Sequence, residues 1–216
     1  VLLVLMAAAL WLGTPSKDHK PGKGRPLREL LKPLAEMRVW RFSLYYVVVF
    51  GAYVALSVWL PRYYVDVFDI SLTKAALLTA LFIFPASLLR PLGGWLSDRF
   101  GARRIMYLVF GTMSLALLFL AAPNGHLALY TPPKADPSAS VSVMRFVMTP
   151  TLFTVLIFIV GCGMGVGKAA VYKYIPEYFP RDVGAVGGLV GLLGALGGFV
   201  LSRLFSDAWA VTGVPQ

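Results

Sequence analysis

The sequence predicts an all-α integral membrane fold, and three observations support this class. Of the 216 residues, 58% are hydrophobic, whereas a soluble domain has about 45–50%. Only 14% are charged, against about 25% in an average soluble domain. The charged residues also leave apolar intervals of about 20 residues between them, which is the length that crosses ~30 Å of hydrocarbon.

The chain begins with an apolar segment that is too short to cross a bilayer, since a transmembrane helix needs about 20 residues. We therefore expect residues 1–13 to be the end of a helix, followed by a basic linker over 14–40. The start of this linker is rich in Pro, Gly and Lys. Its later part either forms a short surface helix with Leu30, Leu31, Leu34 and Met37 toward lipid or is a solvated run of charge.

Five full spans are predicted after the linker, near residues 41–61, 74–96, 104–122, 149–173 and 184–206. The proline-rich segment from Pro123 to Val143 is expected to be irregular. Residues 207–216 are expected to be the end of a fragment.

The net charge of +10 would suggest a nucleic-acid partner in a soluble protein. In a membrane protein it is explained by the Lys and Arg that gather in cytoplasmic loops, so no nucleic acid is expected. The basic loops are 14–40, 97–104 and 174–183, and they lie on one side if every span crosses. We therefore expect a multi-pass protein of the cell membrane with these loops in the cytoplasm.

No pattern in the sequence indicates a metal site, a cofactor or an enzyme. Cys162 is the only cysteine and lies in an apolar run, which favours a packed, inert thiol. His19 and His126 both fall in polar linkers, and no His/Cys/carboxylate cluster has the spacing of metal ligands.

Arg90 is the most informative single residue, because it lies in an otherwise apolar stretch from Ala75 to Ser97. A charge within a span is costly and indicates function by default. No carboxylate shares this stretch, so the expected partner is an anionic ligand. Arg90 precedes Asp98 by eight residues, about 12 Å at the helical rise of ~1.5 Å. The alternative, snorkelling to the cytoplasmic edge, covers only part of that distance.

The segment GWLSDRFGARR, which starts at Gly94, resembles the loop signature of the major facilitator superfamily. Gly101 would permit a tight reversal, and Asp98 would pair with arginines across the loop. The alternative is a merely solvated basic turn. An inserted Ala102 leaves open whether Arg103 or Arg104 makes the family's loop contact. The residues assigned to this conformational loop are Gly94, Asp98, Arg99, Gly101, Arg103 and Arg104.

The glycine-rich string GGLVGLLGALGGF is similar to the nitrate signature of the nitrate/nitrite porter family, as is the preceding segment GKAAVYKYIPEYFP. In membranes glycine lets helix backbones approach closely, and plain close packing is the alternative reading for any one glycine. The signature positions are Gly187, Gly191, Gly194, Gly197 and Gly198.

The resemblance covers essentially the whole chain and implies the incomplete C-terminal helix bundle of a major facilitator. Residues 1–13 would end helix six, 14–40 would be the central cytoplasmic loop, and 41–206 would hold helices seven to eleven. Helix twelve and the first half of the transporter would then be missing. The signature occurs in both halves of the family, and the long basic linker upstream favours the second.

The resemblance also implies a site for a planar anion. Arg90 matches the family's substrate arginine, and Tyr46 and Phe50 match an aromatic pair at i and i+4, for which a packing or lipid-facing role is the alternative. Lys168 either binds or gates, or it snorkels. The implied function is secondary active transport of nitrate or nitrite by alternating access, as proton symport or nitrate/nitrite exchange. The partners would be the anion, protons in symport, the lipid bilayer and the missing half. A carrier for another small anion and a non-transporting scaffold are the alternatives.

Overall fold

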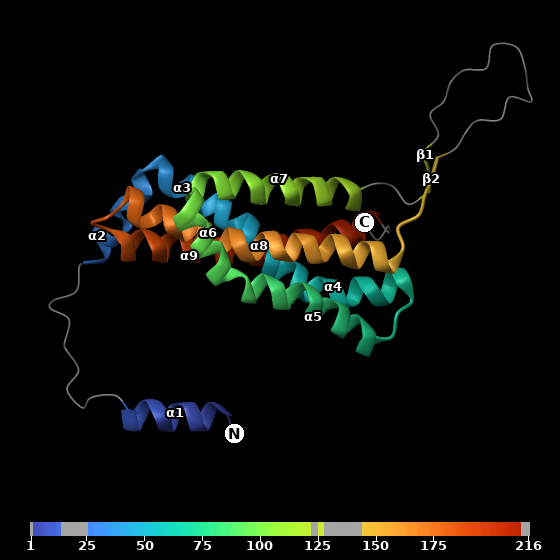
Figure 1. Ribbon diagram of the computed structural model, residues 1–216, viewed down its shortest axis with the longest axis horizontal. Helices are drawn as coiled ribbons and strands as arrows, with labels where there is room; N and C mark the ends of the chain where they lie inside the picture. Colours follow the sequence, from blue (N-terminus) through green and yellow to red (C-terminus); the bar gives the residue numbers. More distant parts are fainter. Residues whose placement is uncertain (1, 14–25, 122–124, 128–143, 213–216) are drawn as a thin grey trace, which may run out of the picture. The chain divides into compact units, whose positions relative to one another are not determined.

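The computed structural model describes residues 2–13, 26–121, 125–127 and 144–212 (Figure 1). The chain divides into two units, Val1–Lys32 and Pro33–Gln216. Helix α1 (Leu2–Gly13) of the first unit is apolar and shorter than a span.

The later part of the linker is helical in pieces. It contains the short helix α2 (Leu27–Leu31) and the 3-10 turn η1 (Lys32–Ala35), and Pro33 within that turn is buried.

The first long helix of the second unit is continuous over Met37–Phe68. It consists of α3 (Met37–Tyr46), a π-helical turn η2 (Val47–Gly51) and α4 (Ala52–Phe68). The predicted span 41–61 is therefore too short. Arg62, just beyond the predicted end, lies within the helix and pairs with Asp66 one turn later at 3.1 Å, so a charge at the edge of an apolar interval does not mark the end of the helix.

The second predicted span, 74–96, is not one straight helix. It is made of α5 (Leu72–Leu88) and α6 (Arg90–Phe100), which are bent by 42° relative to each other. Pro85 lies in the last turn of α5 and Pro91 in the first turn of α6. Each lacks a backbone N–H and crowds the preceding turn, which is the usual cause of a sharp kink.

The remaining spans are α7 (Ala102–Leu120), α8 (Pro150–Tyr178) and α9 (Val183–Thr212). Gly101, with a φ of 87°, makes the reversal between α6 and α7. Between α7 and α8 the strands β1 (Gly125–Leu127) and β2 (Met144–Phe146) pair antiparallel. The segment Pro123–Val143 was expected to be irregular, but its residues 125–127 pair with residues 144–146. Residues 128–143 lie outside the described part.

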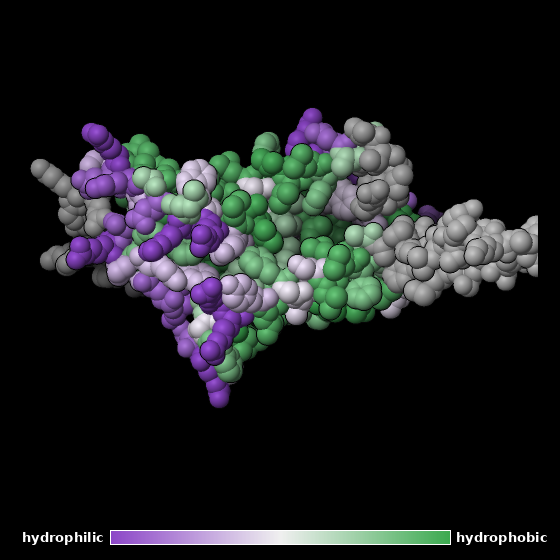
Figure 2. All heavy atoms as spheres, turned by 90° about the horizontal axis from the view of Figure 1, so that it is seen from above, coloured by the Kyte–Doolittle hydropathy of each residue, from purple (hydrophilic) through white to green (hydrophobic). Residues whose placement is uncertain are grey.

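By length and apolarity, four of the described helices can cross a membrane, and the bent pair α5–α6 raises the number to five. Figure 2 shows hydrophobic residues over the middle of the face drawn, with many hydrophilic residues gathered toward the left end, where the α6–α7 and α8–α9 turns lie. This distribution is that of a membrane-embedded bundle with a polar end.

Helix α8 occupies the centre of the bundle. In the most apolar 18 residues of α8, half are buried, against 28–33% in the corresponding stretches of the other three long helices. Helix α8 packs against α5, α6 and α7. Two glycines allow close contact with α5: a Cβ at Gly161 would lie 2.7 Å from the Phe82 carbonyl oxygen, and one at Gly165 would lie 2.8 Å from that of Pro85.

Helix α9 makes a comparable close contact with η2. A Cβ at Gly51 would lie 2.9 Å from the carbonyl oxygen of Gly194 and 2.9 Å from the backbone nitrogen of Gly198. Because both obstacles are backbone atoms, neither can move aside without separating the helices.

We expect Gly51→Ala to destabilise the protein by about 1–3 kcal/mol, because the added methyl group forces η2 and α9 apart. Gly111→Ala is the matched control, since a Cβ at this helical glycine meets nothing within 4 Å, and it should leave stability unchanged or raise it by up to about 1 kcal/mol. Thermal unfolding of the purified protein in detergent measures both. Equal melting temperatures for the two variants would contradict the packing analysis.

Candidate functional site

Arg90 is the first residue of α6 and directly follows the bend. Its side chain is exposed in this chain, and its Nη2 donates a hydrogen bond of 3.4 Å to the hydroxyl oxygen of Tyr46 at the end of α3. No ion pair joins Arg90 to a carboxylate among the described residues. Most of its donors are therefore available to a ligand.

Tyr46 and Phe50 share one face, as the sequence predicts, although a π-helical turn lies between them. Their rings are stacked, with centroids 5.0 Å apart and an interplanar angle of 13°. Tyr46 is buried and Phe50 half-buried. The Tyr46 hydroxyl thus faces Arg90 while its ring anchors the stack.

The signature glycines of α9 make room for this aromatic stack. A Cβ at Gly194 would collide with the Tyr46 ring, and one at Gly197 would lie 2.6 Å from the Val47 side chain. Gly198 faces the backbone of Gly51: a Cβ at Gly198 would lie 3.2 Å from the Gly51 carbonyl oxygen.

Tyr172 of α8 completes the aromatic cluster, and sequence reasoning missed it. Its ring stands edge-on to Tyr46 at 5.0 Å, and its hydroxyl donates to the Gly187 carbonyl at 3.3 Å. A Cβ at Gly191 would lie 2.9 Å from that hydroxyl, whereas one at Gly187 would make ordinary contacts of 3.7 Å or more. These two glycines therefore lie beside Tyr172.

Lys168 is buried, with 2% of its surface exposed. Its Nζ donates to the Ala86 carbonyl at 3.2 Å, lies 3.1 Å from the centroid of the Tyr53 ring and 5.8 Å from that of Phe50. A snorkelling lysine would instead extend its ammonium group toward the polar edge. Tyr53 was also missed, although Tyr46, Phe50 and Tyr53 follow an i, i+4, i+7 pattern.

The conformational loop has a different ion pair from the one expected. Asp98 pairs with Lys173 of α8, and not with an arginine of the loop. Arg103 donates from Nε to the Tyr107 hydroxyl at 3.2 Å, one turn further along α7. The reason is that the reversal at Gly101 carries Arg103 onto the next helix, while α6 packs along α8 and brings Asp98 to Lys173.

The other loop residues are solvent-exposed or lightly packed. Arg99 lies 5.5 Å from the Trp95 ring and 5.6 Å from the Phe100 ring. Arg104 is exposed, and a Cβ at Gly94 would meet nothing within 4 Å. In the described part of the chain, no three His, Cys, Asp or Glu side chains are grouped so that they could hold a metal ion.

The family model described as "Major Facilitator Superfamily" matches residues 1–202 of this chain. The chain belongs to the major facilitator superfamily. The structure fits this family: it is a bundle of apolar helices, with a reversal at Gly101.

Within this superfamily, the comparisons confirm the resemblance to nitrate and nitrite porters. The chain is 68% identical over its whole length to a "Probable nitrate/nitrite antiporter NarK1" of Thermus thermophilus, of which it covers 48%. It is 32% identical over 81% of its length to the "Nitrite extrusion protein" of Bacillus subtilis, covering 38% of that protein. It is 35% identical over 81% of its length to a "Probable nitrate/nitrite transporter NarK2" of Mycobacterium tuberculosis, covering 39%. The chain thus spans about half the length, or less, of these curated relatives.

We expect Asp98 and Lys173 to show a small, salt-sensitive coupling, because both side chains are more than one-third exposed. A double-mutant cycle with Asp98→Asn and Lys173→Gln should give about 0.2–1 kcal/mol at low ionic strength and less in 0.5 M salt, on the order typical of exposed pairs. Thermal unfolding of the four proteins at both salt concentrations measures it. A coupling of the same size at both concentrations would show that the pair does not act as an exposed ion pair.

Proposed function

We propose that this chain belongs to a secondary carrier that moves nitrate or nitrite across the cell membrane by alternating access. The observation that carries the proposal is the cluster of Arg90, Tyr46, Phe50 and Lys168, in which two cations border stacked aromatic rings. The names of the related proteins support the choice of anion. A carrier of this kind performs no chemical step and needs no cofactor.

The cluster suits a small planar anion. The guanidinium of Arg90 offers donors in one plane, and the Tyr46–Phe50 stack offers flat apolar surfaces to a planar ligand. Arg90 also stands at the N-terminus of α6, an 11-residue helix whose dipole favours an anion at that end. A monovalent oxyanion would gain from all three.

The exposed side of Arg90 is where we place the rest of the site. The chain covers 48% of its Thermus relative, and the family resemblance implies a second arginine from the first half. We propose that residues 41–206 contain helices seven to eleven, that 1–13 ends helix six, and that loops 14–40, 97–104 and 174–183 face the cytoplasm. The anion would then lie between two halves of one transporter.

Binding of the anion would promote the movement between inward and outward states. Lys168 is held by a neutral carbonyl oxygen and an aromatic ring, so its charge is not cancelled by the protein. Moving two uncompensated cations through an apolar environment is unfavourable. A bound anion offsets this cost, which couples transport to occupancy.

Nitrate/nitrite exchange is the mode that we propose. No carboxylate among the described residues forms an ion pair with Arg90 or Lys168, and the Thermus relative is named an antiporter. Proton symport is the second candidate, because Lys168 is a buried titratable group next to the binding cluster.

Arg90→Lys should lower nitrate uptake by the full-length carrier about 10–100-fold at subsaturating nitrate, because an ammonium group cannot reproduce the planar donor pattern. Arg203→Lys is the matched control; Arg203 pairs with Asp207 on α9 at 3.3 Å and should leave uptake unchanged. Uptake into proteoliposomes measures both. Normal uptake by Arg90→Lys would refute the role of Arg90 in binding the anion. An unmutated carrier that moves another anion but not nitrate would refute nitrate as the substrate. An unmutated protein that moves no anion would favour a scaffold.

The transport mode is tested by loading proteoliposomes with nitrite in the absence of a pH gradient. Exchange predicts that internal nitrite accelerates nitrate uptake, and that an inwardly directed proton gradient alone does not. Uptake driven by the proton gradient into empty vesicles would instead establish symport, and would direct attention to Lys168 as the titrating group.

A further inference from the structure

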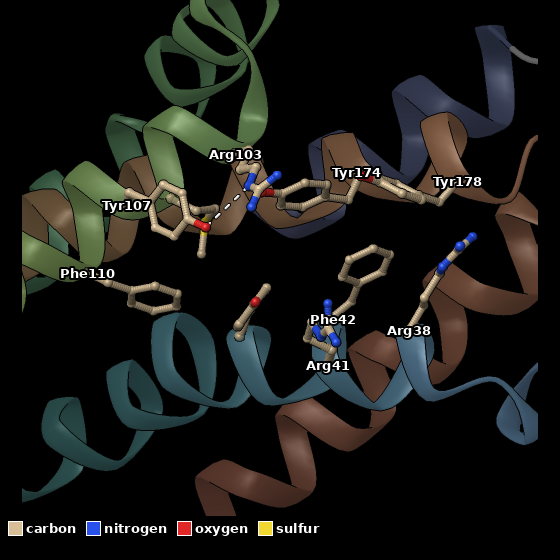
Figure 3. A pocket seen from close by; sticks show the side chains of 10 residues that line it. Arg38, Arg41, Phe42, Arg103, Tyr107, Phe110, Tyr174 and Tyr178 are labelled. Carbon is tan, nitrogen blue, oxygen red and sulfur yellow. Dashed lines mark hydrogen bonds between the residues drawn. The ribbon is translucent and has the colours of Figure 1, made fainter.

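A pocket lined by three arginines shares no residue with the Arg90 cluster. It has a volume of about 200 Å³ and is formed by the N-terminal part of α3, the N-terminal part of α7 and the end of α8. Figure 3 shows Arg38 and Arg41 coming from α3 and Arg103 coming from α7 on the opposite side.

The floor of this pocket is a fixed aromatic surface. Phe42 and Tyr174 stack with centroids 5.1 Å apart and an interplanar angle of 12°, and they are 5% and 7% exposed. Tyr178 stands edge-on to Phe42 at 5.6 Å. A ligand would therefore meet a surface that is already ordered.

The three arginines carry charge that the protein does not neutralise. Arg103 is hydrogen-bonded to the neutral Tyr107 hydroxyl, and Arg38 lies 5.5 Å from the Tyr178 ring centroid. No ion pair with a carboxylate is made by Arg38, Arg41 or Arg103 in the described part of the chain. Five N–H donors per guanidinium leave most of their hydrogen-bonding capacity unused.

The positions of the arginines along their helices also disfavour a purely structural role. Arg38 is the second residue of α3 and Arg103 the second residue of α7. Helix N-termini carry partial positive charge, so cations there oppose the helix dipole and anions are favoured. A topology signal needs basic residues in a loop but does not need them to surround one cavity.

We propose that this pocket binds a phosphate group. Its three guanidinium groups offer a multivalent oxyanion site, since arginine matches phosphate oxygens with paired donors. The phosphate can come from the headgroup of an anionic phospholipid or from free phosphate in solution. Basic pockets between transmembrane helices are a recognised setting for lipid headgroups.

The test uses the purified full-length protein in detergent, titrated separately with a short-chain phosphatidic acid and with inorganic phosphate, and read by thermal shift. The variant Arg38→Gln/Arg41→Gln/Arg103→Gln removes the pocket's charge. The control Arg28→Gln/Lys32→Gln/Arg181→Gln removes three exposed charges outside the pocket. The single variant Arg41→Gln is included in case the triple variant fails to fold.

We expect the unmutated protein and the control to bind at least one of the two probes, and the pocket variant to bind it about tenfold or more weakly. Binding of both probes assigns free phosphate chemistry, and binding of the phosphatidic acid alone assigns a lipid headgroup. Equal affinity in the pocket variant and the control, or binding of neither probe by the unmutated protein, would overturn the proposal. The role of Arg90 in binding the transported anion is tested separately by nitrate uptake, so either proposal can fail alone.

Discussion

The absence of side chains at the glycines of α8 and α9 is the constraint on which the candidate site depends. Gly161 and Gly165 let α8 approach the backbone of α5, and Lys168, three residues further on, reaches the Ala86 carbonyl of α5. On the other side of the cluster, Gly194 of α9 leaves the space that the Tyr46 ring occupies. Close packing therefore sets the depth of Lys168 and the orientation of the Tyr46 hydroxyl that accepts a hydrogen bond from Arg90.

The bend between α5 and α6 serves the same cluster in a different way. A straight helix would continue the backbone hydrogen bonding past Leu89, whereas the break makes Arg90 the start of a new helix. A cation at a helix N-terminus is unfavourable by itself. The hydrogen bond to Tyr46 relieves little of this, because the acceptor is neutral. Under the proposed function, an anion at this position would offset both the guanidinium charge and the helix dipole.

The location of the long apolar helices could be predicted from the sequence, because uncharged intervals of about 20 residues match the thickness of a bilayer. The bend could have been anticipated from Pro85 and Pro91. The burial of Lys168 could not be predicted, because the sequence places this residue only along its own helix. Its actual environment is a carbonyl and a ring supplied by two other helices. The same limit applies to Asp98, whose partner lies 75 residues away, and to Tyr172, whose role depends on how α8 meets α3 and α9.

The two cationic sites differ in a way that matches different anions. At Arg90, one guanidinium and one lysine border a stack of rings, and the lysine is already engaged by a carbonyl and an aromatic face. Under the proposed function, such a site would hold a small anion and leave flat surfaces for a planar ligand. In the α3–α7–α8 pocket, three guanidinium groups surround a small cavity of about 200 Å³. A monovalent anion would leave most of that charge uncompensated, whereas a phosphate group offers more charge and more acceptor oxygens to the same donors. Under the two proposals, the first arrangement would bind the transported anion, and the second would hold a phosphate group between α3, α7 and α8.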